Sequence, residues 1–582
     1  MSSSEKCALN ALVQAHIEKI YPQLPSSEIA DKLIIAMGLH GCQHPAISHT
    51  NHWSEQDIWV ITYGDSIYAE GEAPLKTLSN FLDRELGSLI NGVHVLPFYP
   101  YSSDDGFSVI DYKQVDSKLG DWSDIEHLAQ NYKLMSDLVL NHCSAKSQWF
   151  ENFILQVDPG KDYFLALPKD TNLAGVIRPR TSPLLTEFET AQGPKWVWST
   201  FSADQVDLNY ANIDVLIEMI TIIKLYLDKG VTVFRLDAVA FLWKELSSTC
   251  AHLPQTHEVV RLMRTLIEHH SPEAIIITET NVPNNENLSY FGNANEAHGV
   301  YNFSLPPLIL HALISGTSKH LKAWQMSMPP AQTGTFYLNF IASHDGIGLR
   351  PAEGLLSEEE ISQLVTCMES FGGKISWRTS DNNKNKPYEI NIALIDAFQG
   401  CHEGRDPWQL ERFLCAHAIM LSLEGIPALY IHSIIGTHND NEGVALHQHN
   451  RAINRYKWDY HQLKSELNNE QSHHHLVYKN IRHLLALRRQ QPAFHPNAVQ
   501  YTLHVCDEIF AFWRQSAKRD QSIFCLHNVS NKTVNITLAS LNLIALNTWV
   551  DIVTEQYIEE DDDVLTLAPY QFVWLSNNFF KA

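Results

Sequence analysis

Short apolar segments alternate with helix-length segments along this chain from about residue 56 onward. Each apolar segment is nearly continuous, which is typical of strands in a parallel sheet that is covered on both faces. The candidate strands are residues 57–66, 91–100, 133–142, 230–240, 273–280, 299–305, 336–346 and 425–433. Eight strand–helix units of this kind predict an α/β fold, a closed (β/α)8 barrel of the TIM type.

Each candidate strand ends in polar or charged residues, often His, Asp or Glu. In a (β/α)8 barrel the C-terminal ends of the strands carry the chemistry. The pattern therefore places the functional site at this end of the barrel.

The remaining regions predict additions to a catalytic barrel at 56–497. Residues 1–55 indicate a helical N-terminal extension, and alternating apolar residues in 498–582 predict a small antiparallel β domain. Two connections are too long for simple loops: 144–207 after the third strand and 347–400 after the seventh. We expect both to be inserted domains, because long loops in a compact domain are usually lids or binding segments.

Composition excludes several classes of partner. A formal net charge of −24 argues against nucleic acid and against an acidic membrane surface. No apolar run reaches the roughly 18 residues of a spanning helix, and the first residues lack the pattern of a secretion signal. Nine scattered cysteines without a C-x-x-C pair favour free thiols in a reducing compartment. We expect a cytoplasmic protein without nucleic-acid or membrane partners; the oligomeric state stays open.

A histidine-rich connector between the extension and the barrel raises the question of a metal site. Its candidate ligands are His40, Cys42, His44, His49 and His52. Their spacing matches no compact metal motif, and the chain holds 30 histidines in all. We therefore expect no metal and no other cofactor.

Three carboxylates stand at the ends of separate candidate strands: Asp237, Glu279 and Asp345. Glycoside chemistry needs at least two carboxylates that flank the scissile bond, one of them nucleophilic and one a proton donor. The apolar residues before Glu279 favour a raised pKa, which suits an acid. Arg235 shares a strand face with Asp237 and can keep that carboxylate ionised as a nucleophile.

Several strings of the sequence resemble a known family. DLVLNH, FRLDAVAFLWKE, TET and ASHDG are similar to the four short regions shared by the α-amylase superfamily, glycoside hydrolase family 13. SSDDGFSVIDY, IRPR, WVWSTFSADQVDLNY, SLPPLILHAL, HDGIG and RAINR narrow the resemblance to its sucrose-phosphorylase-like branch, subfamily 18. Ser343 departs from the Asn of amylase-type members. Beyond Asn141 no calcium ligand of the amylases is evident, so the resemblance implies no structural calcium.

The resemblance implies a role for each matching residue. Asp237 would be the nucleophile, Glu279 the general acid/base and Asp345 the group that stabilises the transition state. The resemblance further implies glucosyl contacts from Asp105, His142, Arg235, His344 and Arg451, an apolar wall from Phe107 and Phe201, Gln205 near the intermediate, and a phosphate site at Arg180 beside Tyr388. For the two phenylalanines, ordinary core packing is the alternative.

The implied reaction is that of a retaining phosphorylase, which turns an α-glucoside and inorganic phosphate into α-D-glucose 1-phosphate and a released acceptor. The extension and the strings WFENF, RPRTSPLLTEFE, SLPPL and KPYEIN most resemble the branch members that act on glucosylglycerate. Glu389 stands where the sucrose enzymes usually carry Gln. A glycerate carboxylate needs a cation, for which Lys374, Arg378 and Lys386 are candidates.

Other functions remain open at this point. Sucrose, sucrose 6′-phosphate or glucosylglycerol could be the substrate of the phosphorylase. The same scaffold could serve a hydrolase or transglucosidase, or a catalytically inactive sugar-binding protein, because a fold does not determine function.

Overall fold

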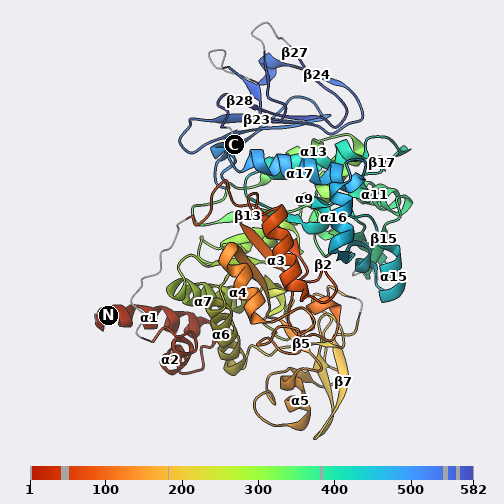
Figure 1. Cartoon of the computed structure of the whole chain (residues 1–582). Helices are drawn as coiled ribbons and strands as arrows, with labels where there is room; N and C mark the ends of the chain where they lie inside the picture. Colours follow the sequence, from red (N-terminus) through yellow and green to blue (C-terminus); the bar gives the residue numbers. More distant parts are fainter. Residues whose placement is uncertain are drawn as a thin grey trace.

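The protein is described here by a computed structural model that covers residues 3–40, 51–180, 182–379, 385–541, 548–558 and 564–580, with side chains from residue 8 onward except that of residue 379. Eight parallel strands close into a barrel (Figure 1). In barrel order they are β1 (Trp59–Thr62), β19 (Ile426–Tyr430), β13 (Phe336–Asn339), β12 (Gly299–Tyr301), β11 (Ile275–Thr278), β10 (Val231–Asp237), β4 (Lys133–Val139) and β3 (Gly92–Val95). The predicted barrel is confirmed, and each predicted strand segment contains one of these strands.

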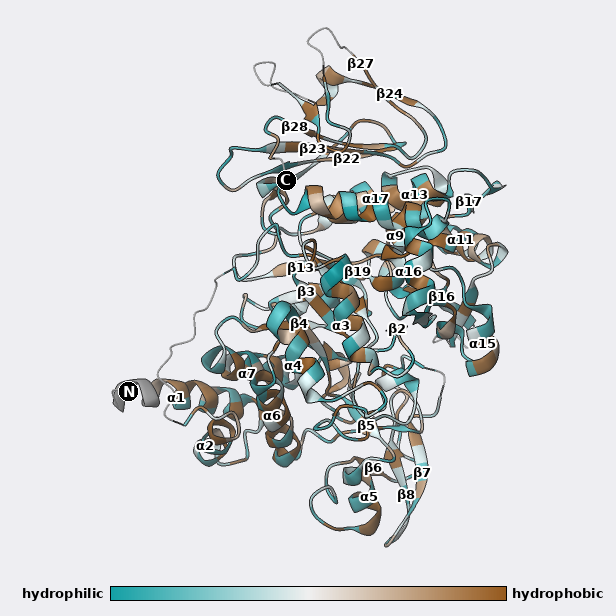
Figure 2. Ribbon diagram, viewed as in Figure 1, coloured by the Kyte–Doolittle hydropathy of each residue, from teal (hydrophilic) through white to brown (hydrophobic). Residues whose placement is uncertain are grey.

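Helices follow most of the barrel strands in the chain, and most of these helices cover the outside of the barrel (Figure 2). They are α3 (Pro74–Glu85), α4 (Trp122–Asn131), α6 (Ile213–Asp228), α7 (Pro254–His270), α8 (Asn284–Leu288), α9 (Leu305–Ser315), α10 (Lys319–Ser327), α12 (Leu394–Ala397), α13 (Gln409–Ser422), α14 (Ile431–Ile434), α15 (Asn441–His447), α16 (Tyr460–Asn468) and α17 (His473–Arg488).

Local sequence determines where these elements begin and how closely they pack. α3 begins with a proline, whose fixed φ suits the first turn, and α4 begins with a capping box of Asp121 and Asp124. On β3, a Cβ atom at Gly92 would lie 2.1 Å from the ring of Trp59. Only glycine at position 92 therefore leaves room for the Trp59 indole where β1 and β3 pair.

The region after β4 forms a small subdomain beside the mouth of the barrel. It contains β5 (His142–Ser144), α5 (Gln148–Leu155), β6 (Ala166–Leu167), β7 (Leu185–Thr190), β8 (Gly193–Trp198) and β9 (Gln205–Asp207). The buried ammonium of Lys244 joins it to the barrel by donating to Asn141 Oδ1 at 2.7 Å and pairing with Asp207 Oδ2 at 2.8 Å. Asn141, the position that the resemblance connects with calcium, thus already binds a protein cation.

A second small sheet follows β13. Its strands are β14 (Ile347–Gly348), β16 (Asn385–Asn391) and β15 (Lys374–Thr379), in that order, and α11 (Glu358–Ser370) lies between β14 and β15 in the chain. Ile347 pairs with Ile390 and Gly348 with Glu389 in the β14–β16 ladder. This sheet brings the end of the seventh barrel strand next to Tyr388 and Glu389.

The two ends of the chain add separate layers (Figure 1). Helices α1 (Ser3–Ile20) and α2 (Ser26–Ala36) lie against α6 and α7, where the Tyr21 hydroxyl donates to the Tyr210 carbonyl at 2.7 Å. A six-stranded sheet above the barrel contains β21 (Val499–Leu503), β22 (Ile509–Gln515), β23 (Ser522–Asn528), β28 (Phe572–Ser576), β25 (Val550–Asp551) and β26 (Gln556–Tyr557), beside the pair β24 (Val534–Thr537) and β27 (Val564–Leu567).

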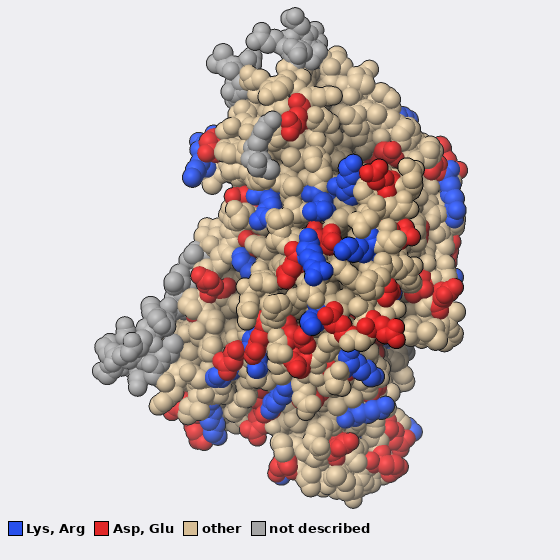
Figure 3. Space-filling model, in the orientation of Figure 1, with Lys and Arg blue, Asp and Glu red and all other residues tan. Residues whose placement is uncertain are grey.

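The surface and the connector bear on the predicted partners. On the face shown in Figure 3, lysines and arginines are interspersed with aspartates and glutamates and form no continuous basic patch. Among the described helices, none is long and apolar enough to cross a bilayer. Cys42, His44 and His49 of the histidine-rich connector lie outside the described residues.

Packing of the N-terminal helices should contribute measurably to stability. Leu33 on α2 is fully buried, whereas Leu12 on α1 is 50% exposed. We expect Leu33→Ala to lower the free energy of unfolding by about 2–4 kcal/mol, because the truncation leaves a cavity. Leu12→Ala, the matched control, should cost less than about 0.5 kcal/mol. Urea denaturation followed by circular dichroism measures the free energy of unfolding of both variants. Equal losses in the two variants would show that burial of the Leu33 side chain does not stabilise the protein.

Candidate active site

A layer of charged side chains crosses the inside of the barrel. Arg235 on β10 lies directly beside Asp137 on β4 in the parallel ladder. Its Nη1 donates to Asp137 Oδ1 and, at 2.7 Å, to Asp237 Oδ1. His94 on β3 contacts the other Asp137 oxygen at 2.7 Å. One buried guanidinium thus holds two carboxylates, which satisfies the requirement that a buried charge be paired.

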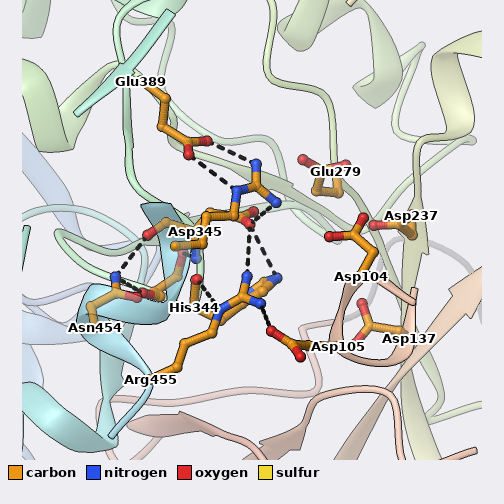
Figure 4. Close-up of polar contacts among 12 residues, drawn as sticks. Asp104, Asp105, Asp137, Asp237, Glu279, His344, Asp345, Glu389, Asn454 and Arg455 are labelled. Atoms are coloured by element: carbon orange, nitrogen blue, oxygen red, sulfur yellow. Dashed lines mark hydrogen bonds and ion pairs between the residues drawn. The ribbon is translucent and has the colours of Figure 1, made fainter. Parts of the chain in front are cut away.

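The other two predicted catalytic carboxylates reach the same space from the ends of β11 and β13 (Figure 4). Glu279 directly follows β11; its Oε2 accepts from the Ala238 backbone N–H at 3.3 Å, and its Oε1 lies 3.8 Å from Arg235 Nη2. Asp345 lies in the loop after β13, where its carboxylate pairs with Arg451 Nη1 at 2.5 Å. Asp237, Glu279 and Asp345 line one cavity at the C-terminal ends of the strands.

Asp237 and Glu279 share a poorly hydrated environment. Burial raises the pKa of both carboxyl groups, and for Asp237 the nearby Glu279 raises the pKa further against the opposing effect of Arg235. Arg235 donates directly to Asp237 but stays 3.8 Å from Glu279. The hydrogen bond favours the ionised form of Asp237, whereas Glu279 receives no such bond from Arg235 and is the better placed of the two to carry a proton. This arrangement provides one nucleophile and one acid.

Asp345 has the opposite environment. Although burial raises its pKa, the guanidinium of Arg451, His344 and the more distant Arg455 together hold that pKa below its ordinary value. Asp345 is therefore an anion whatever the state of Glu279. A permanent negative charge at this position can stabilise positive charge that develops on a sugar ring.

Neutral polar groups and aromatic rings form the inner wall of the cavity. Burial lowers the pKa of His142 and lowers that of His344 to about 3, so both imidazoles are neutral. Gln205 Nε2 lies 3.3 Å from His142 Nε2, and the Phe107 ring stacks on His344 with centroids 5.1 Å apart. Phe201 packs against His142 at 5.1 Å. Such a wall offers hydrogen bonds to sugar hydroxyls and keeps water away.

The structure corrects the prediction for Asp105. This carboxylate points away from the cavity and pairs with Arg455, whereas its neighbour Asp104 lines the cavity and accepts from Gln205 at 3.1 Å (Figure 4). Both aspartates have positive φ, 54° and 45°, in a tight 3-10 turn. The turn sends adjacent side chains in different directions, which the sequence string alone does not reveal.

The outer part of the cavity is formed by the two inserted regions. Arg180, from the first, lies over the Tyr388 ring of the second at 5.7 Å from its centroid. Both residues line the cavity, together with Arg350 and Asn281. The predicted phosphate arginine and its tyrosine are therefore next to each other at the mouth.

The prediction that Glu389 contacts substrate is not supported by its position. Glu389 is buried behind the cavity and accepts two hydrogen bonds from Arg451, at 3.1 and 2.8 Å. It holds the arginine that neutralises Asp345. The loop cations also lie elsewhere: Arg378 pairs with Glu353, Lys386 pairs with Glu358, and Lys374 is exposed outside the cavity lining.

All other predicted site residues line the cavity. They are Phe107, His142, Arg180, Phe201, Gln205, Arg235, Asp237, Glu279, His344, Asp345, Tyr388 and Arg451. Sequence reasoning missed Asp104, Asp137, Asn281 and Arg350. A signal was present for Asp137, which interrupts an apolar strand just as Arg235 does.

Comparison with known proteins places this geometry in a family. Residues 81–346 match the description "Alpha amylase, catalytic domain", and residues 502–574 match "Maltogenic Amylase, C-terminal domain". A glucosylglycerate phosphorylase from Spirochaeta thermophila is 44% identical over 529 residues, 89% of this chain and 90% of its own. The chain belongs to the α-amylase family, glycoside hydrolase family 13.

A second relative supports the assignment to this family, and a solved structure shows the same fold. A glucosylglycerate phosphorylase from Escherichia coli is 42% identical over 90% of this chain and 92% of its own. The crystal structure of a sucrose 6F-phosphate phosphorylase from Thermoanaerobacter thermosaccharolyticum has the same fold, with a TM-score of 0.72 and 22% identity over 88% of this chain and 98% of its own.

Removal of the buried guanidinium should destabilise this α-amylase family member in a pH-dependent way. Arg235→Gln leaves Asp137 and Asp237 buried without a cation, which we expect to cost about 3–5 kcal/mol near pH 7. Buried, unpaired carboxyls have raised pKa values in the folded state and so take up protons on folding. The deficit should therefore shrink as pH falls toward 5. Urea denaturation at several pH values measures this effect.

Arg378→Gln provides the matched control for that experiment. Arg378 is partly exposed and pairs with Glu353 at the surface, so its loss should cost less than about 1 kcal/mol at any pH. A deficit for Arg235→Gln that grows on acidification would contradict the assignment of two unpaired carboxylates.

Proposed function

We propose that this chain is a retaining glucosylglycerate phosphorylase, which converts 2-O-α-D-glucosylglycerate and phosphate to α-D-glucose 1-phosphate and glycerate. The 44% identity to a glucosylglycerate phosphorylase, over nine tenths of both chains, carries the proposal. The cavity supports it, because the three carboxylates with the chemistry of a nucleophile, an acid and an anionic stabiliser share it with Arg180, which has no carboxylate partner among the described residues.

In the first step the Asp237 carboxylate attacks the anomeric carbon of the glucosyl unit. The bond between that carbon and the glycosidic oxygen breaks, and Glu279 transfers its proton to the leaving oxygen. Glycerate departs with this oxygen as a neutral hydroxyl group, and a β-glucosyl ester of Asp237 remains. Arg235 keeps Asp237 in place through the 2.7 Å hydrogen bond.

In the second step a phosphate oxygen attacks the same carbon from the face that glycerate has left. The ester bond to Asp237 breaks, and Glu279 takes the proton of the attacking phosphate hydroxyl. Each displacement inverts the anomeric carbon once, so the product keeps the α configuration. Side chains handle every charge and proton in both steps, and we propose no metal or cofactor besides the co-substrate phosphate.

The competition between phosphate and water is decided at the two ends of the cavity. Phe107 and Phe201 limit access of water to the ester at the inner end. At the outer end Arg180 offers a planar pair of donors to a phosphate, which suits arginine geometry. A local cation of this kind is needed in a chain whose net charge is −24.

We further propose that the protein is located in the cytoplasm. The cysteines of the described part of the chain are all unpaired, and most of them are buried. Buried free thiols fit the reducing environment of the cytoplasm, where the phosphate co-substrate is also available.

Substitution should distinguish the role of Glu279 as acid from that of Asp237 as nucleophile. Glu279→Gln cannot donate a proton, so we expect about a 10³-fold loss of activity on glucosylglycerate but a much smaller loss on α-glucosyl fluoride, whose leaving group needs no proton. Asp237→Asn should abolish turnover of both substrates while the protein remains folded. Initial rates of glycerate and fluoride release measure this difference; equal losses in Glu279→Gln would contradict its role as acid.

The pH dependence of the wild-type enzyme follows from the same pair. Activity requires ionised Asp237 and protonated Glu279, so the rate should fall on the alkaline side as Glu279 loses its proton. Because burial raises the pKa of Glu279, this fall should occur above the ordinary glutamate value of 4.5. In Glu279→Gln with α-glucosyl fluoride, the alkaline fall should disappear.

An acceptor screen tests the proposed substrate. Offered α-D-glucose 1-phosphate with glycerate, glycerol, fructose or fructose 6-phosphate, the chain should release phosphate fastest with glycerate. A preference for fructose, fructose 6-phosphate or glycerol would assign it to one of the other phosphorylases.

The forward reaction separates the remaining alternatives. Formation of glucose 1-phosphate from glucosylglycerate should require phosphate. Free glucose that appears at the same rate without phosphate would indicate a hydrolase or transglucosidase. Binding without turnover would indicate an inactive sugar-binding protein.

A further inference from the structure

The arginines of the cavity fall into two groups. Among the described residues, Arg180, Arg235, Arg350 and Arg451 line the cavity. Arg235 pairs with Asp137 and Asp237 and lies 3.8 Å from Glu279, and Arg451 pairs with Asp345 and Glu389, so the charge of both arginines is neutralised within the protein. Arg180 and Arg350 differ: no described carboxylate lies within ion-pair distance of either guanidinium. Two uncompensated cations therefore border the space that the substrates enter.

Arg350 is placed at the mouth by the short element that follows β14. Residues Arg350–Ala352 form a 3-10 turn, and the Arg350 side chain is half-buried. The turn is anchored by the Leu349 backbone N–H, which donates to the Tyr388 carbonyl at 3.0 Å. Tyr388 in turn lies under Arg180. Arg180 and Arg350 thus both lie beside the β14–β16 ladder, but they reach the cavity from different segments of the chain.

Asn281 lies next to this turn. It follows the acid Glu279 by two positions, and its amide packs on the backbone of Gly348, where a Cβ atom would lie 2.9 Å from Asn281 Nδ2. Within the described residues its buried Oδ1 has no hydrogen-bond partner. An acceptor without a partner among the described residues and the Arg350 side chain therefore line the same cavity as Glu279.

We propose that Arg350 binds the carboxylate of the glycerate unit and determines the choice of acceptor. This inference rests on the proposed function. In 2-O-α-D-glucosylglycerate the carboxylate is attached to the carbon that carries the glycosidic oxygen, so its binding group must lie close to Glu279. Arg350 offers two parallel donors to a carboxylate, and Asn281 Oδ1 accepts from the remaining hydroxyl of glycerate.

The same geometry explains discrimination against neutral acceptors. Glycerol or fructose would leave the half-buried Arg350 without an anion, and an ionic group that loses water without gaining a partner weakens binding. Arg180 remains the group for phosphate, which attacks after glycerate has left. The loop cations Arg378 and Lys386 are excluded from this role, because both pair with surface glutamates outside the cavity.

Kinetics of the full-length Arg350→Gln variant test the proposal. With α-D-glucose 1-phosphate as donor, kcat/KM for glycerate should fall about 30- to 100-fold, as expected for loss of a charge-assisted pair. The value for glycerol should change less than about threefold, which also shows that the variant is folded and catalytically competent. The KM for phosphate in the forward reaction should stay within about threefold of wild type.

Three results would overturn the assignment. Equal losses with glycerate and glycerol would mean that Arg350 acts on the structure of the cavity rather than on the carboxylate. A rise in the KM for phosphate larger than the loss for glycerate would make it part of the phosphate site. Unchanged preference for glycerate would place the carboxylate elsewhere.

Two controls separate the proposed role of Arg350 from the proposed substrate, glucosylglycerate. Arg378→Gln makes the same chemical change at a cation outside the cavity and should leave the ratio of glycerate to glycerol unchanged. Wild-type protein is measured first: if it does not prefer glycerate, the proposed substrate is wrong and the role of Arg350 is wrong with it. If wild type prefers glycerate and Arg350→Gln does too, only the role of Arg350 is wrong.

Discussion

The hydrogen bonds of one buried guanidinium organise the catalytic centre. Arg235 joins Asp137 on one strand to Asp237 on the next, and it does so inside the barrel, where an unpaired charge of either sign would be costly. This contact fixes the position of Asp237, and its hydrogen bond favours the ionised form of that carboxylate over the ionised form of Glu279. Stability and catalysis therefore depend on the same group.

The distribution of paired and unpaired cations divides the cavity by function. Arginines neutralised by protein carboxylates hold the inner part, where an uncharged glucosyl unit reacts. Arginines without such partners border the outer part, where two anions are expected, phosphate and the glycerate carboxylate. Glu389 belongs to the inner group although it lies on an inserted strand, because it supports Arg451 behind the cavity. A chain with net charge −24 can thus bind anionic substrates locally.

Much of this could be predicted from the sequence. The apolar strands and their polar ends are local patterns, and they led to the barrel and to the three carboxylates at its mouth. The assignments of Asp105 and Glu389 were wrong for related reasons. Asp104 and Asp105 differ through a turn with positive φ. Glu389 lies on the opposite face of β16 from Tyr388, which lines the cavity, because successive side chains of a strand alternate. Which of two adjacent residues faces the cavity is decided by the tertiary structure.

The sequence by itself determined the order of strands, the position of Asp237, Glu279 and Asp345 at strand ends, and the membership of a family, because each depends on residues that are close in the chain. Only the tertiary structure decided which charges neutralise one another. Asp137 and Arg235 are 98 positions apart, and the turn that carries Arg350 is held to a separate segment by the hydrogen bond from the Leu349 N–H to the Tyr388 carbonyl. Pairing of distant charges depends on how the loops and strands meet in space, and within the described part of the chain that pairing leaves Arg180 and Arg350 without a carboxylate partner.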